Sequence, residues 1–286
     1  MSLKPLLLVD VAQLGLMVHA GLAVIVGAAP RTFIGLRCLE SDVLVAVVDR
    51  AGRDGISKVK VAFEAVERRY AELGYRLERP VTAEIAGMPI MGASKSLKTR
   101  HTLFVSVRAV ESDVLDGLIA HEVGHMRRAE EGHASHNPEV YRSMSHQVRI
   151  PREAEAAFGQ AFNHIQDIYA DDLAFPVFAG SDGGRAYEFF AGWVDNNSRI
   201  RGKDRWQNLG LAASNGFAIG NLLRHGLITA DDKLWELARA FDREAGFHTV
   251  DALAEFYARL PENPSAAAFI GEVKRLAGPM TKAATA

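Results

Sequence analysis

The sequence predicts an α+β fold with a small β-sheet followed by a large, mostly helical C-terminal part. Two observations support this: strand-like apolar stretches occur only before residue 110, and from residue 112 onward helical patterns separated by turns dominate. A third is a histidine pair, "HEVGH", on the first helix after the strands. With 286 residues, of which 48% are hydrophobic and 24% charged, the chain has the composition of an ordinary globular protein.

Charge and cysteine content exclude several classes of function. The net charge of -2 gives no electrostatic reason to expect a nucleic-acid partner. Cys38 is the one cysteine, which excludes an internal disulfide and a zinc site built from several thiolates. We therefore expect a cytoplasmic protein, in which any metal is held by His, Asp or Glu.

The N-terminal part, residues 1–56, contains an uncharged apolar stretch at 11–29. This stretch is long enough to cross a bilayer, so a membrane anchor or a signal segment is one interpretation. However, Gln13 and His19 interrupt it. A signal peptide also needs a basic region before the apolar stretch, and here the positive charge of Lys4 is nearly cancelled by Asp10. We favour a buried element of a soluble fold and keep membrane association as the alternative.

The strands and the first helix are expected before residue 110. The stretch "DVLVAVVD", residues 42–49, predicts a buried strand, and residues 57–75 predict a helix from apolar positions three or four apart. Residues 80–87 and 101–107 predict two further strands. The linking residues 88–100 are polar and contain glycine, which predicts a loop.

Helices are expected from residue 112 onward. Ser112 and Asp113 would open a helix through the histidine pair, and residues 130–151 would form a polar loop. A second helix is predicted over 152–175, ending at Pro176 because proline disrupts helices. After a break at "SDGGR", we expect helices only, which divides the chain into an N-terminal part, a core and a helical C-terminal region: 1–56, 57–178 and 179–286.

The histidine pair has the geometry of a metal site. His121 and His125 are four residues apart, so both rings project from one helical face and can reach one ion. Val114 and Leu118 precede them at helical intervals, which predicts that the histidines face inward. Gly124 would keep the helix surface small where a substrate approaches. The pattern also arises by chance, but its position after a predicted strand favours zinc binding.

At "HEVGH" the sequence resembles the zincin metallopeptidases. The resemblance implies that His121 and His125 bind zinc and that Glu122 is the general base that takes a proton from the attacking water. Metzincins carry a third histidine six residues after the second, where this chain has Glu131, so that subtype does not fit. The sequence is more similar to gluzincins, which take an acidic third ligand from a later helix.

The segment "DIYAD", residues 167–171, is similar to the gluzincin Glu-x-x-Ser/Ala-Asp motif. By this resemblance Asp167 is the third ligand, in place of the usual glutamate, and Asp171 orients a histidine. Aspartate is one methylene shorter, so the two helices would have to approach more closely; aspzincins also use an aspartate. Alternatively, Asp167 and Asp171 lie on a solvated face, and the third ligand is one of the remaining candidates: Asp171 itself, His133, His136 or His164.

The sequence therefore predicts a zinc-dependent metallopeptidase with a peptide or protein substrate and no nucleic-acid partner. The first alternative is a non-catalytic zinc-binding protein with a regulatory or binding role on the same fold. The second is a membrane-anchored quality-control protease, which requires residues 11–29 to span the bilayer. Candidates for stabilising the oxyanion of the reaction are weaker, and the choice among them stays open: His146, Tyr169, Tyr187 and His225.

Overall fold

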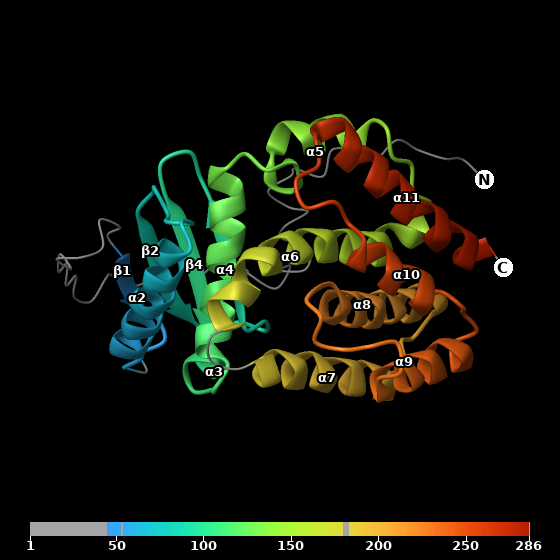
Figure 1. Cartoon of the computed structure of the whole chain (residues 1–286), viewed down its shortest axis with the longest axis horizontal. Helices are drawn as coiled ribbons and strands as arrows, with labels where there is room; N and C mark the ends of the chain where they lie inside the picture. Colours follow the sequence, from blue (N-terminus) through green and yellow to red (C-terminus); the bar gives the residue numbers. More distant parts are fainter. Residues whose placement is uncertain (1–44, 53, 180–182, 286) are drawn as a thin grey trace.

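The computed structural model describes residues 45–52, 54–179 and 183–285 and confirms the α+β prediction (Figure 1). A small sheet with two long helices forms one side of the molecule, and the later helices form the other. The elements, in chain order, are β1 (Val45–Asp49), α2 (Ile56–Glu72), β2 (Val81–Ala86), β3 (Gly92–Ser96), β4 (His101–Ser106), α3 (Val107–Val110), α4 (Leu115–Glu130), α5 (Pro138–Ser145), α6 (Glu155–Ala179), α7 (Gly183–Arg199), α8 (Arg205–Arg224), α9 (Lys233–Glu244), α10 (Val250–Ala258) and α11 (Ala266–Thr285).

The sheet has four strands in the order β1-β2-β4-β3. β1 pairs with β2, and β2 with β4, in parallel, while β3 runs antiparallel to β4 at the edge. The strands expected at 80–87 and 101–107 are confirmed as β2 and β4, and the described end of the stretch at 42–49 is β1. In β2 buried residues alternate with half-buried ones, so helices cover one face of the sheet.

Residues 88–100 were wrongly predicted to be a loop only, because they contain β3. The strand sequence "GASKS" has no apolar alternation, so periodicity could not reveal it. Gly92 packs closely on α4: a Cβ at this position would lie 2.8 Å from the side chain of Leu118, which would have to move. The edge strand is therefore specified by its contact with α4 and by pairing with β4 rather than by its own composition.

The first hydrophobic core lies between the sheet and helices α2 and α4. The hydroxyl of Tyr70 on α2 donates a 2.8 Å hydrogen bond to the carbonyl oxygen of Ala120 on α4, so the two helices are joined directly. Apolar residues of α2 three or four apart point into this core, as the sequence predicted. The largest fully buried side chains here are Phe63, Tyr70, Leu77, Ile85, Leu103, Ile119 and Met126.

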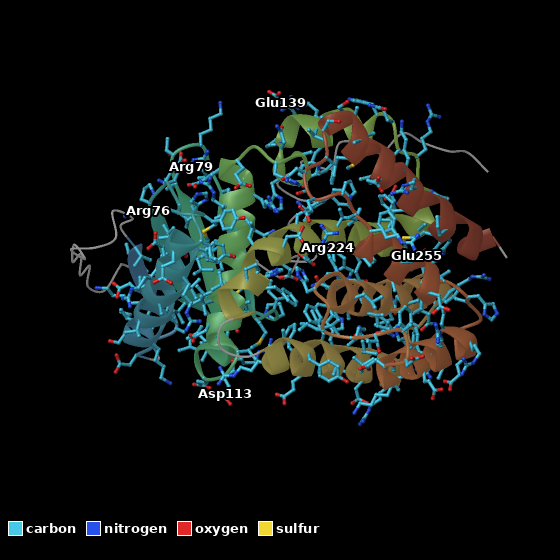
Figure 2. All side chains as sticks on the ribbon, viewed as in Figure 1. Arg76, Arg79, Asp113, Glu139, Arg224 and Glu255 are labelled. Atoms are coloured by element: carbon cyan, nitrogen blue, oxygen red, sulfur yellow. The ribbon has the colours of Figure 1, made fainter. Side chains whose placement is uncertain are left out.

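The second core is helical and centres on α6 and α8, packed with α7, α9, α10 and α11. Figure 1 shows α6 running from this helical part to α4. Arg224 of α8 (Figure 2) is half-buried; it binds the carboxylate of Asp172 on α6 and donates to the carbonyl oxygens of Ala258 and Leu260. Apolar residues near the end of α6, such as Leu173, belong instead to the sheet core. Where the chain divides into domains stays a prediction.

The helix that carries the histidines starts later than predicted. Ser112 and Asp113 do not open it; α4 begins at Leu115, after the short helix α3. The hydroxyl of Ser112 donates to the carbonyl oxygen of Ala109, so it satisfies the end of α3 rather than the start of α4. Asp113 is exposed in the turn between the two helices (Figure 2).

Two predicted boundaries in the next segment were also wrong. Residues 130–151 include α5, which begins where the side chain of Asn137 accepts from the backbone N–H of Glu139 and where Pro138 takes the first helical position. Helix α6 continues through Pro176 to Ala179 instead of stopping before it. Proline removes one N–H donor, but packing of the flanking Leu173 and Val177 in the sheet core holds the helix together.

The apolar stretch at 11–29 lies outside the described residues. Among the helices that the structure describes, none is both long and apolar enough to cross a membrane.

Candidate metal centre

Helices α4 and α6 meet at Gly124. A Cβ at Gly124 would lie 2.5 Å from the carbonyl oxygen of Ala170, closer than side-chain carbons approach other atoms. The interpretation of Gly124 as room for a substrate is therefore wrong, because the backbone of α6 fills that space. The close approach that an aspartate ligand requires is present, and glycine on one helix and alanine on the other permit it.

This contact brings the three predicted ligands together. Nε2 of His121 and Nε2 of His125 are 3.0 Å apart, and Oδ1 of Asp167 lies 3.7 Å from the first and 3.4 Å from the second. Two atoms that bind the same tetrahedral zinc ion at ~2.1 Å are separated by about 3.4 Å. The two nitrogens and the oxygen therefore fit one small cation, and their types are those that zinc accepts.

Asp171 lies where the sequence predicted a group that orients a histidine. Its Oδ1 is 2.7 Å from Nδ1 of His121, which directs the Nε2 of that ring toward Asp167. The other oxygen, Oδ2, accepts a 2.6 Å hydrogen bond from Nδ2 of Asn221 on α8. Asp171 and Asn221 are buried, so the alternative in which Asp171 lies on a solvated face is not what the structure shows.

Asp167 is held by a second group of side chains. Its Oδ2 lies 3.1 Å from Nδ1 of His164, whose Nε2 is 2.9 Å from the hydroxyl of Ser214 on α8. Gln160 donates to the same hydroxyl at 2.8 Å. The ring of His164 also stacks on Phe217 at 4.3 Å. His164 is thus a partner of Asp167 and contacts the candidate site only through it.

The remaining histidines of the segment lie behind His125. Nδ1 of His125 is 2.7 Å from Nε2 of His136, and both His133 and His136 contact the hydroxyl of Ser135. Burial lowers the pKa of His133 below its ordinary value and that of His136 much further, and the nearby Arg128 acts in the same direction. The surroundings of both rings therefore favour their neutral form.

The site attracts positive charge. Burial opposes protonation of His121, but the carboxylates of Asp171, Asp167 and Glu122 outweigh it and raise the pKa of His121 to about 10. Burial likewise opposes ionisation of Asp167, yet hydrogen bonds from His125 and His164 and the nearby charges hold its pKa far below the usual range. A proton and a metal ion would compete for this position, because metal ligands bind in their deprotonated form.

Glu122 is buried on α4 and lies close enough to His121 for its carboxylate to help raise the pKa of that ring. The prediction that Val114 and Leu118 lie on an inward-facing side of the helix, before the histidines, was only partly right. Leu118 packs against Gly92 of β3, but Val114 is 37% exposed. The histidine side chains keep some exposure, 26% for His121 and 17% for His125, so they are not sealed from solvent.

The four candidates for oxyanion stabilisation are not brought together. Tyr169 is fully buried and packs against His133, and His225 stacks on Phe175. The Tyr187 hydroxyl donates to Asp232, which precedes α9. His146 is exposed after α5.

Sequence reasoning missed the contribution of α8. Ser214 and Asn221 are seven residues apart, two helical turns, so they lie on one face of the helix and meet His164 and Asp171 respectively. Small or polar residues recur along α8, but this composition is equally typical of close helix packing. Gly220 illustrates the second use, since a Cβ there would lie 2.6 Å from the carbonyl oxygen of Ala254 on α10.

Comparison with protein families places residues 61–277 in one family, whose description is "Family of unknown function (DUF5781)". The chain belongs to this family. The match includes the candidate metal centre and the helices that surround it. The comparisons with curated proteins and with solved structures find no match. The family description assigns no activity, so the chemistry has to be argued from the residues of the site.

Proposed function

We propose that the chain is a zinc-dependent metallopeptidase that hydrolyses peptide bonds with Glu122 as general base. The observation that carries the proposal is the convergence of His121 Nε2, His125 Nε2 and Asp167 Oδ1 within 3.7 Å of one another. Each of the three side chains is bonded from behind by another group, as expected of ligands that must keep one orientation.

The residues of the site divide the chemistry among themselves. His121, His125 and Asp167 would hold zinc and leave a fourth position open, which is typical of catalytic rather than structural sites. Zinc supplies Lewis-acid chemistry that polarises the scissile carbonyl group. Glu122 takes a proton from the attacking water and returns it to the leaving amine. Asp171 keeps His121 oriented while this happens.

Glu122 favours an enzyme over a protein that only binds zinc. A site that binds zinc for structure needs no carboxylate beside its ligands, and keeping Glu122 buried next to an acidic site is unfavourable. A non-catalytic zinc protein with a regulatory role is the alternative. The two functions differ in one measurable respect, which is whether peptide bonds are cleaved.

The test compares the wild-type protein with Glu122→Gln and His121→Ala. Zinc content is measured after dialysis, and cleavage is measured by mass spectrometry on a library of peptides from digested cell protein. We expect about one zinc per chain in the wild type and Glu122→Gln, cleavage in the wild type only, and zinc loss in His121→Ala. General-base removal lowers rates by on the order of 10²–10⁴. Equal zinc in all three, or equal cleavage by the Glu122 variant, would refute the proposal.

A further inference from the structure

We infer that His133, Ser135 and His136 form a directed hydrogen-bonded relay that holds His125 by its Nδ1, so that its Nε2 faces His121 and Asp167. The relay gives a role to two histidines that the sequence offered only as rival ligands. It rests on the proposed function in one respect, since the Nε2 held at this position is the atom that would bind the metal.

The relay ends at an atom that can only accept. Nε2 of His133 lies 3.2 Å from the carbonyl oxygen of Glu262, in the connection between α10 and α11. A carbonyl oxygen has no hydrogen, so Nε2 of His133 must carry the proton. Because a neutral imidazole has one N–H, Nδ1 of His133 is then an acceptor. The backbone N–H of Ser135 points at this same nitrogen at 3.3 Å, which agrees with that assignment.

Each following proton is fixed by the one before. The hydroxyl of Ser135 lies 2.7 Å from Nδ1 of His133 and must donate to it. Having donated its one hydrogen, that oxygen accepts at 2.8 Å from Nδ1 of His136. Nε2 of His136 is then bare and accepts at 2.7 Å from Nδ1 of His125. His125 is therefore held at Nδ1 and turns Nε2 toward the candidate site.

Burial makes this order of donors and acceptors effective. Ser135 is fully buried and His133 is 8% exposed, so water does not replace their partners easily. Gln166 on α6 donates to the carbonyl oxygen of Ser135, which ties the turn to the helix that carries Asp167. The relay therefore links the backbone of the C-terminal region to a ligand atom through four side chains.

The test reads the tautomers directly. Protein labelled with ¹⁵N-histidine is studied by long-range ¹H–¹⁵N correlation spectroscopy, without metal and after zinc addition, with each ring assigned from a single His→Gln variant. We expect the proton of His133 on Nε2 and the protons of His136 and His125 on Nδ1. A His136 protonated on Nε2, or a His133 protonated on Nδ1, would overturn the inference.

Variants of the relay separate position from stability. Ser135→Ala should release the tautomer of His136 and lower zinc affinity, on the order of 10–100-fold as for other groups that orient ligands. Ser106→Ala is the matched control: Ser106 is equally buried but caps α3, away from the site. It should change stability and leave tautomers and affinity alone. If the two variants behave alike in both respects, the relay has no positioning role.

Two outcomes keep this inference apart from the proposed function. Zinc content of the wild type decides whether the site binds metal, whereas the tautomers of His133 and His136 depend on the Glu262 carbonyl and are read in the metal-free protein. His136→Gln, whose side-chain oxygen can still accept from His125, should retain more zinc affinity than His136→Leu. The reverse order would contradict the relay.

Discussion

Nδ2 of Asn221 donates a 2.6 Å hydrogen bond to Oδ2 of Asp171, across the interface between α8 and α6. Asp171 in turn contacts Nδ1 of His121. An amide 50 residues further along the chain than Asp171 thus determines how the carboxylate behind His121 is turned.

Asn221→Leu should weaken zinc binding roughly 10–100-fold, because Asp171 would lose the donor that orients it. Asn215→Leu is a matched control, since Asn215 is equally buried on the same helix but contacts Ser198 of α7. Both variants should lose stability, and only the first should lose affinity. Competition against a chelator measures the affinity, and equal losses in the two variants would contradict the prediction.

Gly124→Ala should destabilise the chain by about 1–3 kcal/mol, because the new methyl group collides with the backbone of α6 at Ala170. Gly117→Ala on the same helix meets no atom within 4 Å and should instead stabilise the protein by about 0.5–1 kcal/mol. Denaturant unfolding of the metal-free proteins gives both values. A harmless Gly124→Ala would show that α4 and α6 are not in contact there.

Asp167→Ala should leave the protein largely without zinc, since it removes one of three ligands. Asp167→Glu should also lower zinc affinity and activity. Its extra methylene requires a different spacing of α4 and α6, and their contact at Gly124 makes that spacing costly to change. Asp116→Ala, which removes an exposed carboxylate of α4, is the control and should change neither property. Unchanged zinc affinity in Asp167→Ala would return the third ligand to the other candidates.

Glu130→Gln should destabilise the protein by about 1.5–3 kcal/mol at neutral pH, the usual contribution of hydrogen bonds to a charged group. The Glu130 side chain is 1% exposed and accepts from the His101 ring and from the backbone N–H groups of Glu78 and Arg79. Burial alone would raise the pKa of Glu130, but these donors outweigh burial and lower it.

The sign of the pH effect follows from that shift. A carboxylate whose pKa is lower in the folded state stabilises fully above its unfolded pKa, about 4.3, and this stability is lost as pH falls through the lower folded value. The difference in unfolding free energy between the wild type and Glu130→Gln should therefore shrink below about pH 4. Glu255→Gln, which removes an exposed carboxylate paired with the exposed Arg259, should cost under about 1 kcal/mol. Urea unfolding at several pH values checks both statements.

Sequence patterns were sufficient where one physical cause dominated. Apolar residues spaced three or four positions apart predicted α2, and short strand-like apolar stretches predicted β2 and β4. The spacing of His121 and His125 required one helical face, and the order of residues in "DIYAD" placed Asp167 and Asp171 one turn apart. In the structure these four side chains come together, while the identity of any metal stays a prediction.

Long-range contacts account for what the sequence could not show. β3 depends on its pairing with β4 and on Gly92 fitting against α4, and neither leaves a periodic signal. Ser214 and Asn221 are ordinary residues of a small-residue helix until α6 is placed beside them. At Gly124 the sequence predicted space for a substrate, whereas the structure places Ala170 there. A glycine indicates that another group approaches closely, but it does not identify that group.

Helix α6 contributes side chains to both hydrophobic cores and carries Asp167 and Asp171 between them. Neither core can therefore melt without disturbing the helix on which the other depends, so the two should unfold in one cooperative transition despite their different architecture. A ligand bound at the centre would stabilise the whole chain by mass action rather than one half of it. Adding metal should therefore raise the midpoint temperature of thermal unfolding by the same amount whether the spectroscopic probe lies on the sheet or on α10.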